Sequence, residues 1–577
     1  MNLKHYPELK VAEKYLFDAL ALALVLFYGY SALIAPAATQ YHRGVYVIIT
    51  YVLVFLCYRS RFRPLDYALM LVSFVTVGYW ILNFEAINYR SGAETLLDQY
   101  MAVAGVLIGI EVARRVVGNV FVVIGVLLML YGVYGYVEWI PEDLQHAGET
   151  FLGLCTSIFY KSDGVFGIMA NVLATYIVLF VIFGAFLERS GAQSFFIEYP
   201  LAAVGHKIGG PGKVSVIASG LFGSISGSAI ANTVSTGSFT IPMMKRAGFE
   251  KHVAGGIEPA ASIGGMFMPP IMGAGGFIMA ELTGVPYSQI MLVAIFPALM
   301  YFFSVFMMVH YYAKRNNIVG ERSEHSAGEI FRSSWYYLAP LVVITIFMLL
   351  GYSPGYSAVL GVLACIVVSW FRKDTRIGLQ GVLDSARKGT ESSLQIGAIL
   401  GVIGIIIGVL TFSGLILTFA DIVIEAADGK LWLTIIFIAL ASLVLGMGVP
   451  VTAAYLITAV VAVPALTHLG VNLIAAHMIV YWLSQDSNIT PPVCIAAFAG
   501  ATIAGANMWK TAWVAFTFAK FLYLAPFLFG YVPGFSLNGS ASDIGITFAL
   551  VFFGTWLFTF LLSGAFLDVF KGRKSAA

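Results

Sequence analysis

Two short stretches of the chain place glycine, proline, hydroxyl and carboxyl groups in apolar surroundings, and these residue types suit ion binding. Residues 264–270 read Gly-Gly-Met-Phe-Met-Pro-Pro, and residues 486–492 read Asp-Ser-Asn-Ile-Thr-Pro-Pro. Glycine and proline interrupt a helix and free its main-chain carbonyls. Freed carbonyls form a small oxygen cage that suits a hard cation such as Na⁺, while the N–H groups of a half-helix N-terminus suit a carboxylate. The two stretches therefore predict sites for a coupling cation and an anionic solute.

Each interrupted stretch follows a glycine-rich turn. Residues 223–229 read Gly-Ser-Ile-Ser-Gly-Ser-Ala, and residues 446–450 read Gly-Met-Gly-Val-Pro. Neither turn is compatible with a continuous helix. Irregular backbone at membrane depth is tolerated only where protein or a water-filled cavity surrounds it. We therefore expect two helical hairpins, each with its tip facing one break.

The two hairpins and breaks form an internal repeat. When residues 242–274 are aligned with 464–496, identical residues coincide, among them Pro242 with Pro464, Ser262 with Ser484, and the two Pro-Pro pairs. An odd number of expected crossings separates the two tips, so the second hairpin is predicted to enter from the opposite face. An inverted repeat of this kind is typical of secondary transporters.

The composition sets the class of protein that must position these stretches. Hydrophobic residues make up 59% of the 577 residues and charged residues 11%, and the formal net charge is +2. These values exclude a soluble enzyme and a disordered chain, and they give no reason to expect a nucleic-acid partner. We predict an all-α polytopic protein of the lipid bilayer with about 16 membrane segments, including the two re-entrant hairpins and the two broken helices.

Charge predicts the orientation in the membrane. Most of the 32 Lys and Arg residues fall on one side if the N-terminus is cytoplasmic and both hairpins return to the side they entered. This is the pattern of the positive-inside rule. The basic residues expected on the outside are Arg43, Arg90, Lys161 and Lys430, and Lys520 falls within a span.

Several polar residues at membrane depth allow two interpretations. Asp486 either contributes to a Na⁺ site or caps the broken helix, since acids in this position are expensive and usually functional. Glu258 either pairs with a helix end or with Lys520, or takes part in transport. Asn232 and Asn488 either line a solute pocket or bond neighbouring helices together. A purely structural scaffold would not need broken helices. No metalloprotease, nucleophile-elbow or nucleotide-loop motif is found, so we expect a protein that is not an enzyme.

At four motifs the sequence resembles the membrane component of tripartite ATP-independent periplasmic (TRAP) transporters: residues 222–232, 240–245, 269–274 and 486–494. It is most similar to fused permeases with four plus twelve membrane segments that work with TAXI-type binding proteins. The resemblance implies a small-subunit-like four-helix scaffold region at 1–115 and a large-subunit-like permease region at 116–577. Within the latter, residues 213–283 hold the first hairpin and broken helix, and 432–508 hold the second.

The resemblance also implies a function: Na⁺-coupled symport of a small organic acid across the bacterial inner membrane by an elevator mechanism. A monomeric permease would receive the solute from a periplasmic TAXI-type binding protein, and two or more Na⁺ would drive uptake. By motif position, one Na⁺ site comprises Ser224, Ser226, Gly227, Gly264, Gly265 and Met268. The other comprises Gly446, Met447, Val449, Asp486, Ser487 and Thr490, and the solute contacts are Asn232, Thr452 and Asn488. Val451 departs from the family pattern, where relatives often have Thr, and this removes a hydroxyl from the second tip.

A second hypothesis is a standalone Na⁺-coupled carboxylate symporter that needs no binding protein. The additional N-terminal helices favour the first hypothesis, because a monomeric transporter needs a scaffold that standalone dimers build from their own interface. An intramembrane enzyme is a third hypothesis, but it would need a convergent acid-base or metal cluster, which the sequence does not contain.

Overall fold

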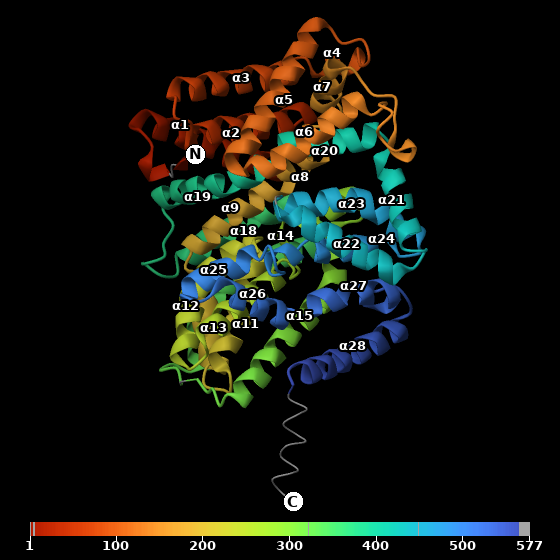
Figure 1. Ribbon diagram of the computed structural model, residues 1–577. Coiled ribbons are helices and arrows are strands. Elements are labelled where there is room, and N and C mark those ends of the chain that lie inside the picture. The colour runs from red at the N-terminus through yellow and green to blue at the C-terminus, as the bar shows by residue number, and fades with distance from the viewer. Residues whose placement is uncertain (1, 4–5, 321, 448, 565–577) are drawn as a thin grey trace, which may run out of the picture. The chain divides into compact units, whose positions relative to one another are not determined.

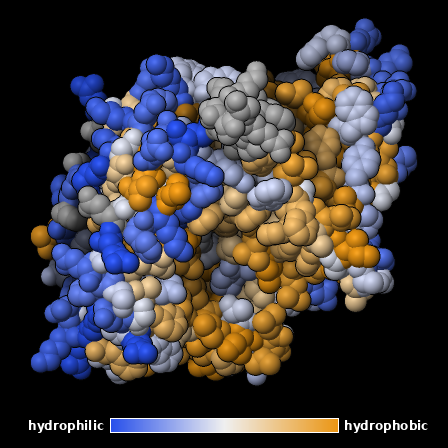
Figure 2. Space-filling view, turned by 90° about the horizontal axis from the view of Figure 1, so that it is seen from below, coloured by the Kyte–Doolittle hydropathy of each residue, from blue (hydrophilic) through white to orange (hydrophobic). Residues whose placement is uncertain are grey.

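The computed structural model describes residues 2–3, 6–320, 322–447 and 449–564, and helices dominate them (Figure 1). Within these residues, 11 helices are long and apolar enough to cross a membrane. Apolar side chains cover wide areas of the surface seen in Figure 2. The predicted all-α polytopic class is confirmed. The only strand pairing in the described part is a two-residue one, between β1 (Asn2–Leu3) and β2 (Tyr58–Arg59).

The chain divides into two compact units, and the first comprises residues 1–190, 343–428 and 448–465. The four expected N-terminal spans are present in it, together with a short helix, α7, that the sequence did not predict. Its elements, including most of α17, are α1 (Val11–Leu33), α2 (Thr39–Cys57), α3 (Arg63–Leu82), α4 (Phe84–Tyr89), α5 (Leu96–Val116), α6 (Asn119–Tyr134), α7 (Phe151–Tyr160), α8 (Ile168–Val172), η3 (Leu173–Ile177), α9 (Val178–Arg189), α17 (Ala339–Leu349), α18 (Pro354–Ser369), α19 (Leu379–Gly397), α20 (Leu400–Phe412), α21 (Leu415–Ala426) and α23 (Val451–His468), with the short turns η1 (Tyr6–Glu8) and η2 (Glu142–Leu144).

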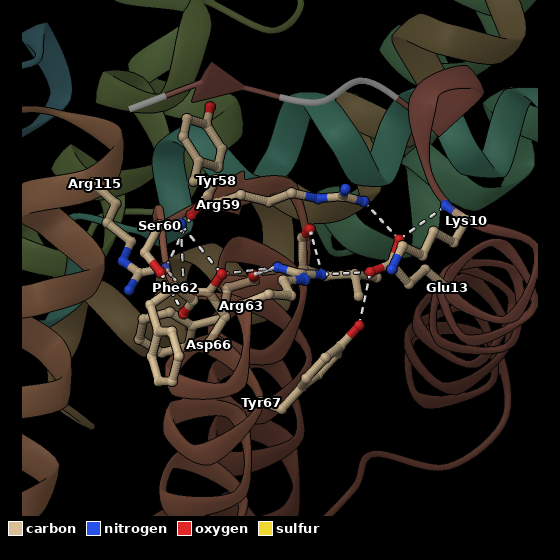
Figure 3. A network of polar contacts seen from close by, with 12 residues as sticks. Lys10, Glu13, Tyr58, Arg59, Ser60, Phe62, Arg63, Asp66, Tyr67 and Arg115 are labelled. Carbon is tan, nitrogen blue, oxygen red and sulfur yellow. Dashed lines mark hydrogen bonds and ion pairs between the residues drawn. The ribbon is translucent and has the colours of Figure 1, made fainter.

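A network of ion pairs joins the helix ends of the first unit at β2 (Figure 3). Glu13 of α1 accepts hydrogen bonds from Arg59 at 2.5 Å and from Arg63 at 2.7 Å. Asp66 of α3 pairs with Arg63 at 3.1 Å and with Arg115 of α5 at 2.7 Å. Because each buried carboxylate has a cation at hydrogen-bond distance, the network satisfies its own charges. The basic residues at these helix ends therefore have a structural role and hold α1, α3 and α5 together.

The second unit comprises residues 191–342, 429–447 and 466–577. It contains the first hairpin, both broken helices and the first helix of the second hairpin. Its elements are α10 (Ala192–Val204), α11 (Gly210–Ser226), α12 (Ala229–Arg246), α13 (Lys251–Gly264), α14 (Gly273–Thr283), α15 (Tyr287–Arg315), α16 (Ala327–Ser334), η4 (Trp335–Leu338), α22 (Leu431–Gly446), α24 (Leu473–Leu483), η5 (Asp486–Asn488), α25 (Ile495–Ala504), α26 (Met508–Phe518), α27 (Phe521–Tyr531), η6 (Pro533–Ser536) and α28 (Ala541–Leu562).

The predicted internal repeat is present in the helix boundaries. Helices α12, α13 and α14 correspond at one constant offset to α23, α24 and α25, and both ends of α12 and α23 agree. The residue two positions after each Pro-Pro pair, Met272 or Cys494, has a left-handed backbone conformation, with φ values of 57° and 51°. Both Pro-Pro peptide bonds are cis. The two interrupted segments therefore share one local structure.

The two broken helices pack crosswise within the second unit. The first half of one, α13, packs against the second half of the other, α25 (Figure 1). In the same way α24 contacts α14. Parallel helices would bring equivalent halves together, so this pairing means that the two broken helices run in opposite directions. An antiparallel pair is what an inverted repeat produces.

The expected division at residue 115 rests on likeness to a small and a large subunit, and it stays a prediction. The compact units follow packing instead, since the first unit joins the N-terminal helices to later segments such as α18 to α21. The two helices of the second predicted hairpin, α22 and α23, belong to different units, and Gly448 between them lies outside the described residues.

Candidate functional site

The tip of the first hairpin lies directly on the first break. A Cβ atom added to Gly265 would lie 2.4 Å from the Cα atom of Gly223, so only glycine allows these two backbones to approach so closely. Gly227 ends α11 with φ of 62°, and a Cβ atom there would lie 3.2 Å from the Cα atom of Gly273, where α14 begins. The structure thus brings the predicted Gly227 and Gly265 to one place, and the N-terminus of α14 adjoins them.

Tyrosine hydroxyls hold the main chain around the first break. The hydroxyl of Tyr301 donates to the Ala260 carbonyl at 2.6 Å. The hydroxyl of Tyr287 lies 2.6 Å from the Ile271 carbonyl and 2.8 Å from the Pro270 carbonyl. The bonds of Tyr287 satisfy carbonyls of the irregular segment between α13 and α14, whereas Tyr301 bonds a carbonyl near the end of α13. The break is therefore a braced structure.

A third tyrosine connects the two broken helices. Tyr481 belongs to α24 of the second repeat, and its hydroxyl lies 2.7 Å from the Met266 carbonyl and also contacts the Met272 carbonyl, both in the first break. Its ring fills the space beside Gly275, where an added Cβ atom would meet it at 2.1 Å. A neighbouring tyrosine and tryptophan, as at Tyr481 and Trp482, are typical of a membrane interface, but both side chains are buried here.

The other residues predicted for the first cation site lie on the same tip and break, with some side chains already engaged. Ser224 is buried, and its hydroxyl donates to the Leu221 carbonyl at 2.9 Å. Ser226 lies 3.5 Å from the Ser228 carbonyl. Gly264 ends α13 and Met268 lies in the irregular segment after it. What these residues have available for a cation is mainly main-chain carbonyl oxygen.

Asn232, a predicted solute contact, lies inside the first hairpin and is fully buried. Its amide donates to the Ser219 carbonyl at 2.9 Å and lies 3.4 Å from the Ser262 carbonyl. These bonds tie α12 to α11 and α13, which is the bonding interpretation left open by the sequence. Contact of Asn232 with a solute stays a prediction.

At the second break a buried carboxylate has an unsatisfied oxygen. Asp486 begins the short turn η5 and is 2% exposed, and its Oδ1 atom has no hydrogen-bond partner among the residues that the structure describes. The side-chain oxygen of the preceding Gln485 is also buried and unpartnered. Buried polar atoms are almost always paired, so two neighbouring unpaired oxygens favour a missing positive or hydrogen-donating ligand.

The second tip reaches this break through α22. A Cβ atom on Gly446, the last residue of α22, would lie 2.3 Å from the Cβ atom of Ser487, so these two predicted residues are in contact. Thr490 lies 2.6 Å from the Asp486 carbonyl and 2.5 Å from the hydroxyl of Tyr523 on α27. Asn488 is buried and donates to the Gln485 carbonyl at 3.2 Å.

The remaining predicted residues of the second tip are Met447, Val449 and Thr452. Met447 follows α22 in the second unit and is 50% exposed. Val449 and Thr452 belong to the first unit. A role for these three residues beside Asp486 stays a prediction.

The broken helices contain another buried carboxyl group besides Asp486. It belongs to Glu258 of α13 and is surrounded by hydroxyls. Ser219 of α11 donates to its Oε1 atom at 2.6 Å, and Ser215, Thr236 and Thr240 also contact the carboxyl oxygens. The sequence analysis considered Lys520 as a partner. That pairing is wrong, because the Lys520 ammonium group instead lies 3.3 Å from the Leu562 carbonyl at the end of α28.

The sequence analysis missed two sets of residues. The tyrosines on α15 and α24 carry no local signal, because nothing in the sequence shows that a side chain far along the chain reaches a break. The hydroxyls around Glu258 do carry a signal in the sequence. Ser215 and Ser219 are four residues apart on one helix, Thr236 and Thr240 on the next, and residues four apart share a helix face.

Comparison with known proteins gives the family. Residues 104–535 match the family described as the DctM component of tripartite ATP-independent periplasmic transporters. A putative TRAP transporter large permease of Haemophilus influenzae is 25% identical over 393 residues, which are 67% of this chain and 86% of that protein. The C4-dicarboxylate TRAP transporter large permease of Pseudomonas aeruginosa is 25% identical over 399 residues, covering 67% and 92%. The crystal structure of the YdaH transporter of Alcanivorax borkumensis covers 73% of this chain and 98% of its own at 15% identity and a TM-score of 0.45, too low to show a common fold.

Proposed function

Because the chain belongs to the DctM component family of tripartite ATP-independent periplasmic transporters, we propose that it takes up a small organic acid by symport with Na⁺ across the bacterial inner membrane. The family is a permease component, so the chain is a multi-pass membrane transporter and not an enzyme. The proposal concerns its coupling ion, its solute and its mechanism.

The observation that supports Na⁺ coupling most is the unpartnered Oδ1 atom of Asp486 beside the tip of α22. A carboxylate oxygen, a neighbouring amide oxygen and unwound carbonyls are the ligands that a hard cation takes. The first tip and break offer mainly main-chain carbonyls, so we assign a second Na⁺ there, at Gly227, Gly264 and Gly265. Ser224, Ser226 and Met268 would complete the first site, and Ser487, Thr490, Gly446, Met447 and Val449 the second.

We propose a carboxylate as the solute, near Thr452 and Asn488, because α14 and α25 begin close to the two breaks and helix N-termini favour anions. A relative named for C4-dicarboxylate transport is consistent with this. Movement of the hairpins and broken helices against the N-terminal helices would give an elevator mechanism. The N-terminus would face the cytoplasm, and a periplasmic TAXI-type protein would deliver the solute to a monomeric permease.

The test is uptake of radiolabelled mono- and dicarboxylates into liposomes that contain the full chain, under an inward Na⁺ gradient, with and without a TAXI-type binding protein. We expect uptake only with Na⁺ and the binding protein present. Uptake that needs Na⁺ but no binding protein would support the standalone symporter instead. Uptake that is indifferent to Na⁺ would overturn the coupling.

A further inference from the structure

The proposed transport cycle assigns no role to the hydroxyl groups that surround Glu258. The carboxyl group is completely buried, and its contacts come from both helices of the first hairpin: Ser215 and Ser219 from α11, and Thr236 and Thr240 from α12. We call this set the hydroxyl cage.

No cation balances Glu258 among the described residues. Its helix packs against α11, α12, α15, α25 and α26, and α25 carries no charged residue. The Lys213 ammonium group is 3.1 Å from His310 on α15, and Lys245 bonds the Ala504 carbonyl at 2.9 Å. The other titratable residues on these helices and on α13 itself are Lys251, His252, Arg246, Lys510, Tyr287, Tyr301, Tyr311, Tyr312, Lys314 and Arg315, and none of them contacts the Glu258 carboxyl group.

If Glu258 is ionised, the hydroxyl groups of the hydroxyl cage supply fewer hydrogen-bonding protons than there are oxygen–oxygen contacts among these groups. Thr236 Oγ1 lies 2.7 Å from the Asn232 carbonyl as well as against the carboxyl group, and Thr240 Oγ1 lies 3.0 Å from the Thr236 carbonyl. A hydroxyl carries one proton, so each threonine donates either to its own helix or to Glu258. When a threonine donates to its helix, its oxygen faces a carboxyl oxygen, and only a proton on Glu258 makes that contact favourable.

The geometry selects a proton over a metal ion. A hard cation stands about 2.0–2.6 Å from each oxygen ligand and lies between them. In the hydroxyl cage the oxygens touch one another directly, as with Ser219 Oγ and Glu258 Oε1 at 2.6 Å. A proton fits within such a contact and a metal ion does not.

We propose that Glu258 is a proton-binding site inside the first hairpin, separate from the cation sites at the tips and independent of whether Na⁺ drives transport. Water supplies the proton and the carboxylate becomes a carboxylic acid, with no other bond changed. The acid then closes the hydroxyl cage and ties α11 and α12 to α13. Loss of the proton leaves a buried anion with no counter-charge among the described residues, so the hairpin must open to water before the proton can leave.

Infrared difference spectroscopy of the full chain in lipid nanodiscs, in Na⁺-free buffer without solute, tests this directly. We expect the C=O stretch of a protonated, buried carboxylic acid at neutral pH that converts to a carboxylate stretch as the pH rises. Glu258→Gln should abolish this band, while Asp486→Asn should leave it in place. Because neither Na⁺ nor a binding protein is present, failure of the transport proposal would not alter the result.

A second variant guards against misfolding of Glu258→Gln. Thr240→Val removes one hydroxyl of the hydroxyl cage and should shift the same band to higher frequency, because the carbonyl loses a hydrogen-bond donor. A wild-type spectrum without the acid band, or a band that neither variant changes, would overturn the proposal.

Discussion

The two broken helices share one local structure but place their buried carboxyl groups in different surroundings. Glu258 of the first repeat is enclosed by hydroxyls, and all its oxygens have partners. Asp486 of the second repeat lies in the break itself with Oδ1 unpartnered. The first arrangement gives both carboxyl oxygens partners, whereas the second leaves one oxygen without a partner among the described residues. In keeping with this difference, we propose a proton at the first carboxyl group and a cation at the second.

The breaks also differ in how they are braced. Tyr287 and Tyr481 bond carbonyls between α13 and α14, and Tyr301 bonds one near the end of α13, while among the described residues the second break has the contact between Thr490 and Tyr523. A braced break positions its remaining carbonyls firmly, and a less braced one leaves room for a side-chain ligand to adjust. The following predictions test this difference.

The largest effect is expected where the first tip meets its break. Gly265→Ala would place a methyl group 2.4 Å from the Gly223 Cα atom, and backbone cannot move aside as a side chain can. We expect transport to fall to background and stability to drop by about 3 kcal/mol. Uptake and the thermal midpoint of the purified chain measure both.

Gly545→Ala is the matched control, because nothing lies within 4 Å of the added methyl group on α28. It should transport like the wild type. If Gly265→Ala were equally active, the close contact of tip and break would be contradicted.

Asp486→Asn tests the second site. The change keeps the shape and removes the charge, so the apparent Na⁺ affinity for uptake should fall by about 10- to 100-fold, which corresponds to about 1.4–2.7 kcal/mol lost from a charged contact. Asp163→Asn, at an exposed loop position, is the control and should leave the affinity as it is. Retained Na⁺ affinity in Asp486→Asn would remove this residue from the site.

Tyr481→Phe tests the bracing of the first break. Loss of the hydroxyl leaves the Met266 carbonyl unsatisfied, which should destabilise the protein by about 1–3 kcal/mol. Tyr531→Phe, at an exposed tyrosine of α27, should have no measurable effect. Thermal unfolding with and without Na⁺ compares the two, and equal midpoints would show that the hydroxyl does not brace the break.

The smallest effect is expected at two lysines that contact carbonyls at the C-terminal ends of other helices, α25 and α28. Lys245 bonds the Ala504 carbonyl at 2.9 Å, and Lys520 lies 3.3 Å from the Leu562 carbonyl. Replacing either by Met should lower stability by about 0.3–1 kcal/mol, with Lys245 the larger because its contact is shorter. Complete loss of transport in Lys520→Met would instead indicate a role in transport.

The sequence alone located the hairpin tips and the helix breaks but not the side chains that bond to one another, and the reason is physical. Glycine and proline act on their own backbone, so the tip at Gly227 and the breaks before Pro269 and Pro491 could be located from residue type alone. The partners of Glu258 and the reach of Tyr481 depend on how helices far apart in the chain pack together. Those contacts form only in the folded structure, which is why Lys520 was wrongly considered for Glu258.

Direct binding of radioactive Na⁺ to the purified full chain tests the central claim that the two carboxyl groups serve different ligands. The wild type should bind Na⁺ saturably, Asp486→Asn should lose one site, and Glu258→Gln should bind with less than about a twofold change in affinity, well below the tenfold that one charged contact is worth. Undiminished binding in Asp486→Asn together with loss of binding in Glu258→Gln would contradict the account.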